Sequence, residues 1–260
     1  THSMQNISEY YFPHSLLSYI KTIGIPWFWN FLVHFLFCGL GMFLFLNILK
    51  LNFHISLLGG ILFMISPYMV TMIVHGHGSQ VMTAAYIPWV MWGIIRLKKD
   101  QSIKNIGILA LLIGLQLQRA HFQIAYYTWG MMVLYLLFYA ISDYLDKKDI
   151  NLKFYLNWLC SSILGFCMSL WIIIPLLNYA SLSNRSISNG GSSFQYATAW
   201  SMHPYELLTM IFPSSYGFGD ATYYGFMPFT NFPNYGGVVL IIAAMICFLD
   251  IHKKKRGRIL

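Results

Sequence analysis

The chain has 260 residues, of which 57% are hydrophobic and only 9% are charged, and its formal net charge is +8. Soluble domains carry about 25% charged residues, so this composition excludes a soluble globular domain. An aromatic content of 18% also excludes a disordered chain, because disordered segments are poor in aromatic residues. We therefore expect a protein that is surrounded by lipid.

Seven stretches are read as membrane-spanning helices, which need about 20 apolar residues each. The long apolar runs show no alternation of polar and apolar residues, which favours helices over the strands of a membrane barrel. The predicted fold is therefore all-α, a polytopic bundle of transmembrane helices. In chain order, the predicted spans are 27–49, 53–74, 81–97, 103–117, 122–141, 154–177 and 235–249.

The distribution of basic residues predicts how the bundle is oriented. Thirteen of the 16 Lys and Arg residues fall in one set of alternating connections, and three fall in the other set. Because cytoplasmic connections are enriched in Lys and Arg, the first set is assigned to the cytoplasm. The amino end is therefore expected outside and the carboxyl end inside. The positive charge then reflects topology, with a contribution from anionic lipid, and no nucleic-acid partner is expected.

This topology divides the chain into four regions: an outer segment (1–26), a six-span bundle (27–179), an outer loop region (180–234), and a seventh span with a basic cytoplasmic tail (235–260). Loops longer than about 12–15 residues are usually functional or disordered. The aromatic outer loop region is expected to be ordered and to carry short helices at the membrane surface, one of them over 204–212. Because the chain starts at Thr1 without an initiator methionine, we expect it to be a fragment whose beginning lies elsewhere.

The loop between the second and third spans contains a His-Gly-His sequence, with His75 and His77. Two histidines flanking a glycine are able to approach one anion or one metal ion, since glycine also lets backbone N–H groups come close. A divalent metal ion, Mg²⁺ or Mn²⁺, would need His121 and an outer carboxylate in addition, and no residue is assigned as a metal ligand. The alternative is a solvated turn with two histidines at the interface.

The connection between the fourth and fifth spans carries Arg119, His121 and Gln123. An arginine beside a histidine and amides suits a phosphate, because the guanidinium donates two parallel hydrogen bonds and stays charged. Polar groups at membrane depth need partners or water. The alternative is therefore a polar contact between helices, with the Arg119 side chain extended to the membrane surface. This connection is the predicted anion site.

The outer loop region supplies a further cation, Arg185, and two carboxylates, Glu206 and Asp220. These carboxylates are the candidates for a general base on the outer face, unless the base lies outside this chain. Each also has a structural explanation. Glu206 follows Pro204 at a predicted helix start, and Asp220 follows a Gly-Phe-Gly turn.

Several motifs follow one another along nearly the whole chain, and their order resembles that of the YfhO-like family of bacterial membrane proteins. Members of that family look like glycosyltransferases of the GT-C type, which move a sugar from a polyprenyl-phosphate carrier to an acceptor outside the membrane. The resemblance therefore implies a multi-pass enzyme of the bacterial cytoplasmic membrane with a cell-envelope polymer as acceptor. The motifs are Ile-Ser-Pro-Tyr from Ile65, His-Gly-His from His75, Ala-Tyr-Ile-Pro-Trp from Ala85, Gln-Leu-Gln from Gln116, His-Phe-Gln-Ile-Ala-Tyr-Tyr from His121, Pro-Tyr-Glu-Leu-Leu from Pro204, Pro213 with Gly217, Tyr-Gly-Phe from Tyr224 and Tyr-Gly-Gly from Tyr235.

The resemblance also implies roles for individual residues. Cations are needed at the carrier phosphate because negative charge grows there as the sugar leaves. The catalytic acidic residue of GT-C enzymes lies in the first outer loop. The resemblance implies that this loop and an upstream span precede Thr1. The implied phosphate-binding residues are His75, His77, Arg119, His121, Gln123 and Arg185, and the residues implied to stack against sugar or isoprenoid are Tyr126, Tyr127, Tyr223 and Tyr224.

Two other functions stay open from the sequence. A lipid or glycolipid transporter (a flippase) would need broken helices or inverted repeats around a site at the membrane midplane, and no internal repeat is found. A non-catalytic membrane assembly protein is the third alternative.

Overall fold

The structure is a computed structural model that describes residues 28–119, 121–145, 149–180 and 201–228 together with a few separate positions, which are 194, 198, 235–238, 241, 242 and 245. The described residues form two compact units, each considered by itself. The first comprises those within 1–65 and 76–182, and the second those within 66–75 and 183–260. The predicted outer segment 1–26, Arg185 and most of the seventh predicted span lie outside the described residues.

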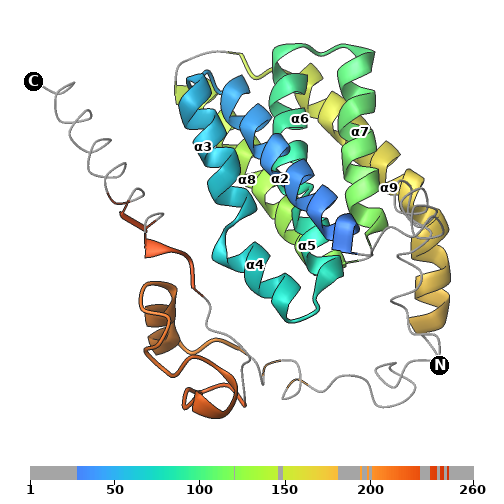
Figure 1. The fold of residues 1–260 in the computed structure, drawn as a ribbon. Helices are drawn as coiled ribbons and strands as arrows, with labels where there is room; N and C mark the ends of the chain where they lie inside the picture. Colours follow the sequence, from blue (N-terminus) through green and yellow to red (C-terminus); the bar gives the residue numbers. More distant parts are fainter. Residues whose placement is uncertain are drawn as a thin grey trace, which may run out of the picture. The chain divides into compact units, whose positions relative to one another are not determined.

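The described part of the chain is helical, with no β-strand in it, as Figure 1 shows. Four helical stretches are long and apolar enough to cross a membrane: Phe31–Ile48, Phe53–Val74, Phe122–Leu145 and Leu152–Asn178. The prediction of an all-α membrane bundle is therefore confirmed. The helices of the first unit are α2 (Phe28–Ile48), α3 (Phe53–Met64), α5 (Gly78–Ala84), α6 (Ile87–Lys99), α7 (Ile103–Gln118), α8 (Phe122–Leu145) and α9 (Leu152–Ala180).

Two stretches that the sequence predicts as single spans are each divided into two helices. Within 53–74, α3 ends at Met64 and Pro67 begins α4 (Pro67–Val74); within 81–97, α5 ends at Ala84 and α6 has Pro88 in its first turn. Proline restricts the residue before it to extended conformations, and it fits the first turn of a helix because no N–H is needed there. The prolines therefore set where the second helix of each pair begins.

In the first unit, α7 packs closely against α9 (Figure 1). A Cβ atom added to Gly165 of α9 would lie 2.7 Å from the carbonyl oxygen of Ala110 and 2.8 Å from Cγ2 of Ile113, both on α7. Glycine lets two helix backbones approach at such a crossing, which matters in lipid because burial of apolar surface gives little driving force there. Helix α7 also packs against α6, so it contacts both α6 and α9.

Helix α2 packs against both α3 and α6. On the α6 side, the Trp89 indole N–H donates a 2.8 Å hydrogen bond to the Phe37 carbonyl oxygen, and the two rings stack at 4.6 Å. On the α3 side, a Cβ on Gly60 would lie 2.7 Å from the carbonyl oxygen of Gly39. Glycine therefore allows a close backbone approach at the α2–α3 crossing, as it does between α7 and α9.

The end of α6 and the start of α7 are held by polar contacts. Asn105 donates to the carbonyl and the carboxylate oxygen of Asp100, both at 2.7 Å, and accepts a 2.6 Å hydrogen bond from Arg96 Nε. The Lys99 ammonium donates to the carbonyl oxygen of Ile48, the last residue of α2. Helix ends leave carbonyl groups without helical partners, so Lys99 satisfies one of them at α2.

The second unit contains α4, η3 (Pro204–Met210) and η4 (Asp220–Thr222). The predicted short helix over 204–212 is present as the 3₁₀ helix η3. His203 caps its start by accepting a hydrogen bond at Nδ1 from the Tyr205 N–H at 3.3 Å.

Candidate functional site

Arg119 caps the carboxyl end of α7, and its side chain is buried, with 1% of its surface exposed. Its Nη2 donates to the Met82 sulfur of α5 at 2.5 Å. Burial lowers the pKa of Arg119 to about 10, against a smaller opposing effect of the Tyr86 hydroxyl, so the guanidinium is still charged at neutral pH. The structure therefore places Arg119 in a helix–helix contact and not with its side chain extended to the membrane surface.

Two glutamines near the end of α7 extend this contact. Gln116 Nε2 donates to the carbonyl oxygen of Thr83 at 3.2 Å and to Oγ1 of Thr128 at 2.8 Å, which ties α7 to α5 and α8. Gln118 Nε2 donates to the carbonyl oxygen of Met168 on α9 at 3.1 Å. Both glutamine side chains are buried, and buried polar groups are costly unless they are hydrogen-bonded. The carboxyl end of α7 is thus held by hydrogen bonds to α5, α8 and α9.

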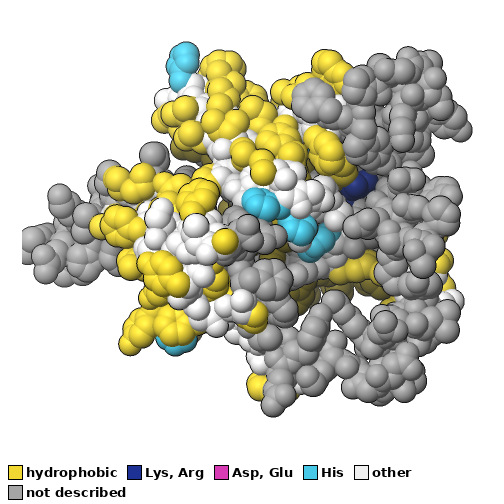
Figure 2. Space-filling view, turned by 60° about the horizontal axis from the view of Figure 1, so that its bottom comes forward, with side chains coloured by type: hydrophobic (Ala, Val, Ile, Leu, Met, Phe, Trp, Pro, Cys, Tyr) yellow, Lys and Arg dark blue, Asp and Glu magenta, His cyan; other side chains and the backbone are white. Residues whose placement is uncertain are grey.

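Two histidines lie at the edge of this polar network. His77 directly precedes α5 and is exposed, whereas His121 directly precedes α8 and is half-buried. Burial, and then the charge of His77, lower the pKa of His121 against a raising effect of its own main chain. His121 is therefore neutral at pH 7, and its Nδ1 is buried without a hydrogen-bond partner among the described residues. In Figure 2, a small group of histidine side chains lies near the centre of the face shown, and other histidines lie apart from it at the edges.

The other residues predicted near this connection have separate surroundings. His75 ends α4 in the second unit and pairs through Nδ1 with the Thr71 carbonyl oxygen at 2.9 Å. Gln123 is exposed and donates to the Tyr127 hydroxyl at 2.8 Å, and the ring of Tyr127 lies 6.0 Å from that of Tyr126. Both tyrosines are exposed on α8, one turn from the connection.

Over the described residues, no three His, Cys, Asp or Glu side chains lie close enough together to hold a metal ion.

In the second unit, Glu206 is buried, with 1% of its surface exposed. Its Oε1 accepts hydrogen bonds from the Phe226 N–H at 2.8 Å and from the Tyr223 hydroxyl, which itself accepts from the Met227 N–H at 2.8 Å. Glu206 thus fastens the segment 223–227 to η3. A Cβ on Gly225 would meet Glu206 Oε1 and the Tyr223 ring, so a larger residue there would displace this hydrogen-bonded pair.

The remaining predicted residues of the outer loop are only partly described. Tyr224 is exposed, and its hydroxyl donates to the Ser215 carbonyl oxygen at 2.7 Å. Asp220 begins η4, but its side chain lies outside the described residues.

Sequence reasoning did not identify Met82, Thr83, Thr128 or Met168 as partners of the connection. Threonine and methionine are unremarkable in an apolar helix, and two of the four partners are backbone carbonyls, which leave no trace in the sequence. The sequence did indicate that Gln116 and Gln118 need hydrogen-bond partners, because polar side chains at membrane depth are costly without them.

A family model matches residues 4–193, and its description is Alpha-(1->3)-arabinofuranosyltransferase, N-terminal GT-C domain. This range covers well over half of the 260 residues and includes the whole α7–α8 connection and both helices that flank it. The chain belongs to this GT-C family. No curated protein and no solved structure matches the chain significantly.

Membership confirms the GT-C part of the predicted resemblance and makes the chain part of an integral membrane glycosyltransferase of the GT-C type. At this level, the GT-C domain acts with a lipid-linked sugar donor and a glycan acceptor. The narrower likeness to the YfhO-like family rests on the sequence motifs alone. His77, Arg119 and His121 lie inside the matched range, whereas Glu206 and Asp220 lie beyond it.

Proposed function

We propose that this GT-C domain, as a YfhO-like protein of the bacterial cytoplasmic membrane, takes a sugar from a polyprenyl-phosphate donor and transfers it to a cell-envelope polymer at the outer face. The observation that carries the proposal is the buried, charged Arg119 beside His77 and His121, inside the range that matches the GT-C family. The α7–α8 connection is then the site of the donor phosphate.

The energetic cost of Arg119 supports a functional role. Removing a charge from water costs several kcal/mol even after the protein has relaxed around it, and ionisable residues within membrane proteins mark functional sites for this reason. A cation in such a low-dielectric position acts on a nearby anion much more strongly than it would in water. Arg119 therefore supplies a positive field without touching the phosphate.

The neighbouring side chains supply direct contacts. His77 and His121 donate hydrogen bonds to the phosphate oxygens as the bond from the sugar to the phosphate breaks and negative charge develops there. Gln123 is assigned a supporting contact with the phosphate. The exposed rings of Tyr126 and Tyr127 are placed against the isoprenoid or the sugar.

The test is glycosyl transfer by the full-length protein in proteoliposomes, with synthetic polyprenyl-phosphate sugars as donors. Arabinofuranose is the first donor to try, because the family model is named for its transfer. We expect His121→Ala to lower kcat/KM by about 100-fold, as loss of a donor to a developing charge does. His54→Ala, an exposed histidine on α3, is the matched control and should resemble the wild type.

Two results would contradict the proposal. One is wild-type transfer by His121→Ala. The other is transbilayer movement of the lipid with no transfer from any donor, which would establish a transporter instead.

A separate experiment tests Glu206. Its burial and its hydrogen bonds favour a structural role, in which it holds the segment 223–227. We expect Glu206→Gln to keep folding and transfer, since the Gln side-chain oxygen accepts from Phe226 N–H and Tyr223 as the carboxylate does. Glu206→Ala leaves these donors unsatisfied and should lower the free energy of unfolding by about 1–3 kcal/mol. Thermal unfolding and transfer rates distinguish the variants. Loss of transfer in Glu206→Gln with unchanged unfolding would instead make Glu206 the general base.

A further inference from the structure

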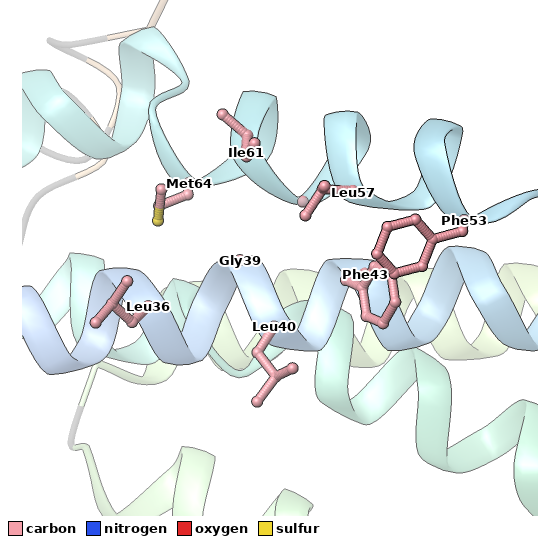
Figure 3. A pocket seen from close by; sticks show the side chains of 9 residues that line it. Leu36, Gly39, Leu40, Phe43, Phe53, Leu57, Ile61 and Met64 are labelled. Carbon is pink, nitrogen blue, oxygen red and sulfur yellow. The ribbon is translucent and has the colours of Figure 1, made fainter.

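An open apolar groove runs between α2 and α3, away from the α7–α8 connection. Its volume is about 360 Å³, within the range of ligand pockets, which is roughly 300–1,000 Å³. Figure 3 shows it along the two helices, with the Phe43 and Phe53 rings at one end and Leu36 and Met64 at the other. Every lining residue is apolar: Leu36, Gly39, Leu40, Phe43, Phe53, Leu57, Gly60, Ile61 and Met64.

The groove is exposed to hydrocarbon. Both helices belong to stretches that are long and apolar enough to cross a membrane, and Leu36, Leu40 and Leu57 are exposed on them. Water has no hydrogen-bond partners in a space with apolar walls. The apolar lining therefore favours a hydrocarbon chain as the occupant of the groove.

One end of the groove is positively charged. Phe53 lies three residues after Lys50, which is exposed in the turn between α2 and α3, and Lys99 donates to the Ile48 carbonyl two residues before it. The sequence has no Asp or Glu from 28 to 99. The first acidic residue after this range, Asp100, is already engaged by Ser102 and Asn105.

Lys50 closes the carboxyl end of α2. Its φ of +66° lies in the left-handed region, and its N–H donates to the Asn47 carbonyl oxygen at 2.9 Å while the Leu51 N–H donates to the Leu46 carbonyl oxygen at 3.3 Å, as at many helix ends. The charge distribution assigns this turn to the cytoplasmic side, where anionic lipids attract basic residues near the membrane surface.

We propose that the α2–α3 groove binds one acyl chain of an anionic phospholipid and that Lys50 and Lys99 hold the phosphate of its headgroup. A second copy of the protein is a poorer occupant, because a stable protein interface takes about 20–30 residues from each side and the groove has nine. This lipid site is independent of the proposed transfer reaction and of its donor.

The test uses the full-length protein in nanodiscs with equal amounts of phosphatidylglycerol and phosphatidylcholine that carry the same acyl chains. After gentle detergent extraction, native mass spectrometry measures which lipid stays bound and the mass of the protein. The wild type should retain phosphatidylglycerol. Leu57→Trp fills the groove and should lose it, whereas Leu58→Trp, on the same helix but outside the groove, should retain it.

The headgroup contact is tested by Lys50→Gln, which should lower the preference for phosphatidylglycerol about five-fold, since one lysine near the surface contributes about that factor. Lys104→Gln, an exposed lysine on α7, is the matched control and should not change the preference. The comparison of Lys50→Gln with Lys104→Gln tests the proposed lipid site even if Leu57→Trp does not fold. Equal retention of both lipids by the wild type, unchanged retention in Leu57→Trp, or a dimer that Leu57→Trp dissociates would each overturn the proposal.

Discussion

Replacing Arg119 with methionine is expected to leave the protein folded while glycosyl transfer falls by about 100-fold or more, because a cation near a developing negative charge is lost. Methionine is long, flexible and apolar, so it fills the space of the buried guanidinium beside Met82. Replacing a buried charge with an apolar group of similar volume is often neutral or stabilising. Activity and stability should therefore separate in this variant.

The measurements are kcat/KM with a polyprenyl-phosphate sugar and the midpoint of thermal unfolding in detergent. Arg119→Lys keeps the charge and should retain more transfer than Arg119→Met. Arg96→Met, which removes an arginine from the last turn of α6, is the control for the loss of a charge as such. If Arg119→Met loses stability and transfer in parallel, Arg119 is only a structural contact. Full activity in Arg119→Met would show that the positive charge of Arg119 does not contribute to catalysis.

Replacing Gly165 with leucine is expected to disrupt the packing of α9 against α7. The first added carbon would already lie 2.7 Å from the Ala110 carbonyl oxygen, a backbone atom that cannot move aside cheaply. We expect a loss of at least the roughly 1–3 kcal/mol that overpacking typically costs. Gln118 reaches the Met168 carbonyl on α9, so a displaced α9 should also weaken the α7–α8 connection and lower transfer.

Gly107→Leu is the matched control, because a Cβ on Gly107 of α7 meets no atom within 4 Å. Leucine favours the helix over glycine, so this variant should unfold at the wild-type temperature or above it. Thermal unfolding of both variants in the same detergent makes the comparison. Equal stability of the two would show that α7 and α9 do not depend on contact at this glycine.

The sequence determines the helices of this protein because lipid forces each spanning segment to satisfy its own backbone. With no water to bind N–H and C=O groups, an apolar stretch of sufficient length must be helical, and that is a local property. Helices α2, α8 and α9 therefore follow from hydrophobic length alone. The effect of proline on a helix is also local. Pro67 and Pro88 lie in the first turns of α4 and α6, next to the two places where predicted spans are divided.

The tertiary structure decides which helices touch and what the polar side chains bind. The prediction that Arg119 and His121 bind a phosphate rests on residue types, but the burial of Arg119 against Met82 depends on where α5 lies. The engagement of Glu206 by Phe226, 20 residues later, likewise depends on how the chain folds back. Helix formation involves residues four apart, whereas partner choice involves residues far apart in sequence. In lipid, that choice depends on close packing at positions such as Gly114 and Gly165, whose contacts hydrophobicity does not encode.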